Sequence, residues 1–230
     1  MWNGKKKAVT FSFDDGVTQD IAVIEILNKY GLKGTFNLNS SLFGLPGCLE
    51  FWERKINHTK IPAGKVKEIY AGHEVAVHTL THPLLPSLSD ETVVYQVEED
   101  RKALSKLCGY EVVGMAYPCG GVNNDDRVAE VIRTQTGVKY SRTITSTKNF
   151  DLQTNYYRFN PSVHICEDDF EELVDKFLAL QSDEPQLFYI LGHAYEMDSP
   201  MMSLEKFDRI CAKLANKTDI FYGTNKDVLL

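Results

Sequence analysis

Two groups of residues in this chain have side chains suited to chemistry on a metal ion, and both follow apolar runs. The carboxylates of Asp14 and Asp15 come directly after an alternating run, residues 9–13, that is typical of a short buried strand. Adjacent buried carboxylates are costly unless a cation or hydrogen-bond donors compensate them, although Asp-Asp-Gly can also be a simple turn. His78 and His82 follow a second strand-like run. We therefore expect the two carboxylates and the two imidazoles to enclose one metal ion.

Two histidines and one carboxylate are a common ligand set for a catalytic zinc ion, and such sites keep positions open for water and substrate. The same nitrogen and oxygen donors would accept cobalt, nickel or iron. If one aspartate binds the ion, its neighbour is free to take a proton from an attacking water, and His193 could protonate the leaving amine or alkoxide. These residues therefore indicate metal-assisted hydrolysis of an amide or ester. The alternative for His78 is a structural histidine in the turn before Pro83.

Strand-like and helix-like segments alternate along the chain, which indicates an α/β fold with a mainly parallel sheet and helices outside it. The expected strands are residues 8–13, 35–38, 74–77, 111–117, 138–141, 186–191 and 220–222. The expected helices are residues 21–30, 65–71, 90–108, 124–135, 168–180 and 204–215. Ser89 is suited to cap the third of these helices and Gly109 to end it. Residues 40–62 have little periodicity and are expected to form a long surface loop.

Polar residues stand at the carboxyl ends of four expected strands. They are Asp14-Asp15, His78, Tyr117-Pro118 and His193. In parallel α/β barrels the carboxyl ends of the strands meet at one mouth, so we expect these residues to share a site. The remaining histidines have no partner at ligand spacing and are expected to be structural or exposed: His58, His73 and His164.

Length and composition define the class of protein. The 230 residues, of which 43% are hydrophobic and 25% charged, suit one domain over residues 1–230. The formal net charge of −7 argues against a nucleic-acid partner. No apolar run reaches about 18 residues and the N-terminus has no apolar signal region, so we expect no membrane span and a cytoplasmic location. The five cysteines form no C-x-x-C pair and are expected to be free thiols, and the oligomeric state is left open.

Four segments resemble motifs of the polysaccharide deacetylase family, also described as NodB-homology or carbohydrate esterase family 4-like proteins. The first and second motifs are similar to Thr10-Phe11-Ser12-Phe13-Asp14-Asp15-Gly16 and His78-Thr79-Leu80-Thr81-His82-Pro83. The third and fifth are similar to Tyr117-Pro118-Cys119-Gly120 and Leu191-Gly192-His193. The segments occur in family order and cover nearly the whole chain. The resemblance implies a distorted (β/α)7 barrel and removal of acetyl groups from N- or O-acetylated sugars.

The resemblance also implies roles for individual residues. Asp14 matches the catalytic base of the family and His193 its general acid. The ligands of the family's metal ion, which is usually zinc, match Asp15, His78 and His82. The expected substrate-binding residues are Tyr117, Pro118 and Leu191, of which Leu191 stands at the apolar position that helps to line the acetyl pocket.

The third and fourth motifs depart from the family pattern. Ala116 stands where the family usually has an arginine that orients the base, and Cys119 replaces an aromatic residue. No segment matches the fourth motif, whose aspartate tunes the general acid. Arg142 is a candidate for the missing guanidinium and is also assigned to substrate binding, while Asp198 is a candidate partner for the general acid. Each of these two could equally be a surface residue.

The sequence is compatible with three functions. The first is a metal-dependent deacetylase acting on an acetylated saccharide. The second is a hydrolase of the same fold that cleaves another non-peptide C–N bond in a small metabolite. The third is a carbohydrate-binding protein without turnover, which is disfavoured because a binding module has little need for a base and an acid beside a metal ion.

Overall fold

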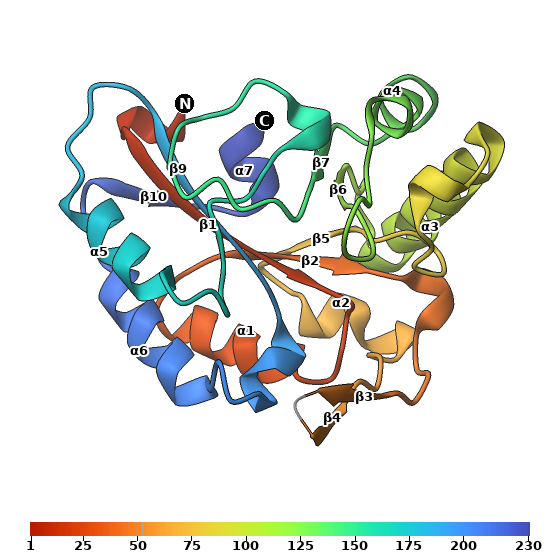
Figure 1. The fold of residues 1–230 in the computed structure, drawn as a ribbon, viewed down its shortest axis with the longest axis horizontal. Helices are drawn as coiled ribbons and strands as arrows, with labels where there is room; N and C mark the ends of the chain where they lie inside the picture. Colours follow the sequence, from red (N-terminus) through yellow and green to blue (C-terminus); the bar gives the residue numbers. More distant parts are fainter. Residues whose placement is uncertain (52) are drawn as a thin grey trace.

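The computed structural model describes residues 1–51 and 53–230, and its central feature is a curled sheet of eight parallel strands (Figure 1). The strands are β1 (Lys7–Asp14), β2 (Gly34–Leu38), β5 (Glu74–Val77), β6 (Gly114–Ala116), β7 (Tyr140–Arg142), β8 (Val163–His164), β9 (Gln186–His193) and β10 (Ile220–Tyr222). Their order is β7-β6-β5-β2-β1-β9-β8, and β10 pairs with the first residues of β1. The mainly parallel α/β architecture expected from the sequence is therefore confirmed.

One segment, residues 159–165, connects the two ends of the sheet. The amide of Phe159 donates to the carbonyl of Ser141 in β7 at 3.0 Å. A few residues later, the amide of Ser162 donates to the carbonyl of Tyr189 in β9 at 2.7 Å. The segment thus passes from β7 to β9 and closes the curled sheet into an irregular barrel.

Helices cover the outside of the sheet, with α1, α5 and α6 grouped on one side and α3 and α4 on the other, whereas α7 lies within the curl of the sheet (Figure 1). The helices are α1 (Asp20–Lys29), α2 (Val66–Ile69), α3 (Asp90–Cys108), α4 (Asp126–Gln135), α5 (Phe170–Ala179), α6 (Leu204–Leu214) and α7 (Asn225–Leu229). As expected, the Ser89 hydroxyl caps α3 and Gly109 ends it in a left-handed conformation, with φ 78°. No helix in the part of the chain that the structure describes is long and apolar enough to cross a bilayer.

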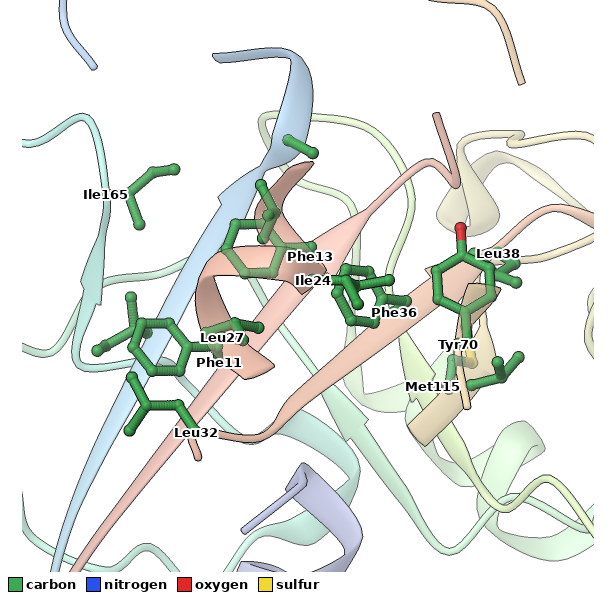
Figure 2. Packing of buried hydrophobic residues seen from close by; sticks show 14 of the residues in the cluster. Phe11, Phe13, Ile24, Leu27, Leu32, Phe36, Leu38, Tyr70, Met115 and Ile165 are labelled. Atoms are coloured by element: carbon green, nitrogen blue, oxygen red, sulfur yellow. The ribbon is translucent and has the colours of Figure 1, made fainter. Parts of the chain in front are cut away.

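Alternate residues of β1 face two different environments, as the period of a strand requires. Apolar residues on one face pack in the main core against the helices: Val9, Phe11 and Phe13. Figure 2 shows Phe11 and Phe13 in this packing. Polar residues on the other face lie inside the barrel: Thr10, Ser12 and Asp14. There, the side chain of Asn225 at the start of α7 bonds to Thr10 at 2.8 Å and to Ser12 at 3.1 Å. The interior of the barrel is therefore polar around these residues, and a smaller apolar cluster that includes Ala8, Tyr140 and Val228 fills another part of it. Most of the apolar core lies outside the sheet.

The expectation of a long loop over residues 40–62 is wrong. This region contains an antiparallel pair, β3 (Cys48–Phe51) and β4 (Arg54–Asn57), at the bottom of Figure 1. The pairing continues in the flanks, where the amide of Lys60 donates to the carbonyl of Leu45 at 2.9 Å. The next amide, that of Ile61, donates instead to the carbonyl of Gly16 after β1 at 2.9 Å. We call residues 44–61 the hairpin insert. It is attached to the turn that follows β1.

The packing of the aromatic cluster between β1, β2 and α2 leads to a first prediction. Phe36 is fully buried, and its ring centre lies 5.7 Å from that of Phe13 and 5.0 Å from that of Tyr70 (Figure 2). The substitution Phe36→Ala is expected to lower the free energy of unfolding by about 3–5 kcal/mol, because it removes a large buried ring and leaves a cavity. Urea denaturation measures the loss.

The control is Tyr95→Ala on α3, where the side chain is 60% exposed. Its effect on the free energy of unfolding is expected to stay within about 0.5 kcal/mol. Similar losses for the two variants would contradict the assignment of Phe36 to the core.

Candidate active site

The expected metal-binding residues come together at the carboxyl ends of the strands. Asp15 follows β1, His78 follows β5, and one ligand atom from each of Asp15, His78 and His82 lies within 4.8 Å of the others. Asp15 and His82 have left-handed backbones, with φ of 83° and 60°, which turn their side chains toward this point. The sequence-based expectation that these residues share a site agrees with this geometry.

The chemistry of this donor set fits a divalent ion. The Nδ1 atom of His78 lies 2.9 Å from the carbonyl oxygen of Ala116, so Nδ1 carries the proton and Nε2 has a free lone pair. Burial lowers the pKa of His78 to about 4, which keeps the ring neutral at physiological pH. Two neutral imidazoles and one carboxylate are suitable ligands for zinc or a related transition metal.

Asp14 lies inside the barrel, where it forms an ion pair with Arg142. The Nη2 atom of Arg142 donates to both carboxylate oxygens, and the amide of Asn37 donates to one of them at 2.8 Å. Burial raises the pKa of Asp14, but the Arg142 charge lowers it, and the net pKa is below the ordinary value. Asp14 is therefore a buried ionised carboxylate.

The position of Arg142 corrects its assignment to substrate binding. Its side chain is fully buried, and Nη1 and Nε donate to the carbonyl of Thr143 at 2.8 Å and the hydroxyl of Ser12 at 3.2 Å. With its donors directed at protein groups, Arg142 has no surface to offer a substrate. It instead places a guanidinium beside Asp14, the alternative that the sequence left open in view of Ala116.

His193 ends β9 and pairs with Glu196, a residue that sequence reasoning missed. The Nδ1 atom of His193 lies 3.1 Å from Glu196 Oε1, and the amide of His193 donates to Oε2 at 2.8 Å. His164, expected to be structural or exposed, contacts the same carboxylate, with its Nε2 3.3 Å from Oε1. Burial lowers the pKa of His193, but the Glu196 carboxylate more than offsets this effect and the pKa rises to about 9.

The expected partnership between Asp198 and His193 is wrong. Asp198 ends the short 3-10 helix η6 (Ala194–Asp198), and its carboxylate accepts a hydrogen bond from Gln19 at 3.0 Å. Glu196 lies three residues after His193, and in one turn of helix this spacing lets its carboxylate reach back to the residue before the helix. That spacing is the signal in the sequence that could have identified Glu196.

Two further residues come from the hairpin insert and contact Asp15. His58 Nε2 lies 3.2 Å from Asp15 Oδ2, and Lys60 Nζ lies 3.2 Å from Oδ1 and 2.7 Å from the main-chain oxygen of Asp15. The expectation that His58 is a residue of the irregular loop without a partner is therefore wrong. Burial raises the pKa of Asp15, but the His58 hydrogen bond and the Lys60 charge lower it well below the ordinary value.

A cavity of about 520 Å³ joins these groups, and we call it the active-site cavity. Its lining includes both aspartates and all three expected catalytic or metal-binding histidines: Asp14, Asp15, His78, His82 and His193. Of the expected substrate-binding residues, Tyr117 and Leu191 line the cavity, whereas Pro118 is buried and is not among the lining residues. A carbonyl compound in this cavity would meet a carboxylate, an imidazolium and a metal-binding set.

Comparisons with known proteins show similarity to one family. The profile of the family described as polysaccharide deacetylase matches residues 2–140. A peptidoglycan-N-acetylglucosamine deacetylase from Listeria monocytogenes is 30% identical over 129 residues, which are 55% of this chain and 24% of that protein. The match thus spans about a quarter of the length of this curated relative.

Two solved structures have the same fold. One is a mutant, with restored enzymatic activity, of a CE4 family pseudoenzyme from Bacillus anthracis, with a TM-score of 0.60 and 20% identity over 98% of this chain and 68% of that chain. The other is a family 4 acetyl xylan esterase from Clostridium thermocellum in complex with a cobalt ion, with a TM-score of 0.61 and 16% identity over 96% of this chain and 90% of that chain. These likenesses confirm the distorted (β/α)7 barrel expected from the sequence.

The ion pair between Asp14 and Arg142 inside the barrel leads to a second prediction. Arg142→Met leaves the carboxylate of Asp14 buried without its guanidinium, so the free energy of unfolding is expected to fall by about 3–5 kcal/mol at neutral pH. Burial then raises the pKa of Asp14 without opposition from Arg142, so the loss is smaller in acid, where Asp14 binds a proton. Denaturation curves at pH 5 and pH 8 measure both effects.

A matched control is Arg127→Met, which removes a surface ion pair with Asp90. Its effect is expected to be at most about 1 kcal/mol. Equal and pH-independent losses for the two arginine variants would contradict the role of Arg142.

Proposed function

Because the chain belongs to the polysaccharide deacetylase family, we propose that residues 1–230 are a catalytic domain that removes acetyl groups from N- or O-acetylated carbohydrate with the help of a divalent metal ion. The observation that carries this proposal is the convergence, in one cavity, of a buried ionised aspartate, a histidine with a raised pKa and a three-residue metal-binding set. The relative from Listeria monocytogenes is named for the deacetylation of an N-acetylated amino sugar, which supports a substrate of that class.

Asp15, His78 and His82 would hold the metal ion, with zinc expected first and cobalt, nickel or iron as alternatives. A bound ion supplies Lewis-acid polarisation of the substrate carbonyl and lowers the pKa of a water molecule. The carboxylate of Asp15 accepts from Lys60 and His58, and its oxygens have four acceptor sites in all, so it can keep these contacts and still act as a ligand.

Asp14 is the proposed general base. Arg142 keeps its carboxylate ionised, and Asp14 Oδ2 lies 4.0 Å from the Nε2 atoms of both His78 and His193. It is thus placed between a metal ligand and the proposed acid, where it can take the proton of the water that attacks the carbonyl carbon. Arg142 and Asn37 fix its orientation and do not themselves contact the substrate.

His193 is the proposed general acid. Its Nδ1 atom is directed at Glu196, so Nε2 faces the active-site cavity and can give its proton to the leaving amine or alkoxide. With a pKa of about 9, the ring is charged at neutral pH before the reaction begins. Tyr117 and Leu191 form the wall against which the substrate would lie, and Leu191 would contact the acetyl methyl group.

The decisive test is acetate release. Protein loaded with zinc or cobalt is expected to release acetate from chito-oligosaccharides or acetylated xylan, and dialysis against a chelator is expected to abolish the activity until metal is returned. Asp14→Asn is expected to lower kcat by about 10²–10⁴-fold, because a positioned general base contributes that much, while the metal content stays unchanged.

The control is Asp183→Asn in an exposed loop before β9, which should keep full activity. Metal-loaded protein that releases no acetate from any acetylated glycan would overturn the proposal. In that case, acyl amides and cyclic amides would test the second function considered above.

The pair formed by His193 and Glu196 makes a further prediction. Because Glu196 holds the pKa of His193 at about 9, above the ordinary 6.5, the charged ring stabilises the fold below about pH 6.5, and this contribution is lost as the pH rises through 9. Glu196→Gln removes the charge, so the pKa of His193 falls and the alkaline limb of the kcat/KM profile moves to lower pH. At pH 8 the activity is expected to fall about tenfold or more. NMR titration of His193 in the metal-free protein measures the pKa directly, and an unchanged titration would refute the assignment.

A further inference from the structure

A second cavity, of about 440 Å³, lies beside the active-site cavity and is bordered by the hairpin insert. Its outer part is lined by aliphatic residues and one glycine: Leu42, Leu45, Pro46, Gly47 and Leu49. Its inner end is lined by residues of the candidate site and their neighbours: Asp15, His58, Lys60, His82 and Tyr195. We call this cavity the leucine groove. Its volume lies within the range of roughly 300–1,000 Å³ that is typical of small-molecule sites.

The leucine groove adjoins the active-site cavity. Asp15, His82 and Tyr195 line both. The ring of Tyr195 stands between them, with its centre 4.9 Å from the ring of His193 on one side and 5.2 Å from the ring of His58 on the other. A molecule that occupies the candidate site can therefore extend past Tyr195 into the groove.

Most of the free surface of the groove is apolar. At the inner end, Lys60 and His58 already direct their polar atoms at Asp15. In the outer part, Leu45 is 50% exposed and Leu42 and Leu49 are half-buried. Leucines on the wall of a cavity are stabilised when an apolar group covers them, whereas they offer no hydrogen bonds to sugar hydroxyls. The groove thus suits an aliphatic chain better than another sugar unit.

The leucines that line the two cavities differ in exposure. Leu191, which lines the active-site cavity together with Ile144, is 1% exposed and so offers a small apolar surface that suits a short acetyl group. The groove is open at Leu45 and can receive a long substituent. On the basis of the proposed function, we propose that the substrate is an amphiphilic glycoconjugate: its acetylated sugar occupies the active-site cavity, and an alkyl chain attached to that sugar lies in the leucine groove.

The test uses alkyl β-glycosides of N-acetylglucosamine with methyl, butyl, hexyl and octyl chains, each below its micelle-forming concentration. For the metal-loaded protein, kcat/KM for acetate release is expected to rise with chain length, by about fourfold for each methylene group that the groove buries fully. We expect two separate variants, Leu45→Asn and Leu49→Asn, to lower the octyl-to-methyl ratio of kcat/KM at least about tenfold. Each of them replaces one apolar residue of the groove wall by a polar one.

The matched control is Leu204→Asn on α6, because this leucine is 38% exposed and lies outside both cavities. The control should keep the ratio of the parent protein. Denaturation curves of the three variants establish that each one folds, and two separate groove variants keep the test valid if one of them does not.

Binding of octyl β-glucoside, which has no acetyl group, separates this inference from the proposed function. Calorimetric binding that weakens in Leu45→Asn, without acetate release from any glycoside, would support the groove and overturn the deacetylase. Acetate release that is independent of alkyl length would support the deacetylase and overturn the groove. A rate that rises only with the length of the N-acyl chain would also overturn it, because the groove would then hold the acyl group.

Discussion

The ion pair between Asp14 and Arg142 is the interaction on which the rest of the site depends. A carboxylate that is 2% exposed stays ionised only if a positive group compensates the loss of water. That group comes from β7, which lies four positions from β1 in the sheet order, so only a curled sheet brings the two side chains into contact. Residues 159–165 hold the curled sheet closed. The charge of the proposed base therefore depends on the curvature of the barrel.

The two adjacent aspartates have different tasks because the backbone separates them. Asp14 is the last residue of β1 and faces the interior, where its partners are Arg142 and Asn37. Asp15 has a φ of 83°, which ends the strand and turns its carboxylate toward the mouth of the barrel, near His82 and the hairpin insert. Each carboxylate thus has its own set of compensating groups, which explains how a buried strand can end in two neighbouring negative charges.

Local patterns in the sequence are sufficient for the main elements and for the convergence of Asp15, His78 and His82. Strand periodicity, helix caps and the rule that parallel strands end at one mouth are all short-range or general signals. The contacts of Lys60 and Glu196 are different, because they depend on how the hairpin insert and η6 fold back onto the barrel. The buried position of Arg142 could have been inferred from strand alternation, since it lies two residues after Tyr140 and shares its face. A charged side chain is usually exposed, however, so the residue type of Arg142 disfavours the interior position that strand alternation indicates.

The sequence distance across the interior has a consequence for folding. The Asp14–Arg142 pair joins residues 128 positions apart, and the bond from Asn225 to Ser12 spans 213 positions. Contacts of such high contact order form slowly, because loop-closure entropy must be overcome first. The chain cannot dehydrate Asp14 before Arg142 arrives, since the lone charge opposes collapse of the interior. We therefore expect closure of the barrel and neutralisation of this charge to occur together late in folding, with water around the carboxylate until the barrel is closed.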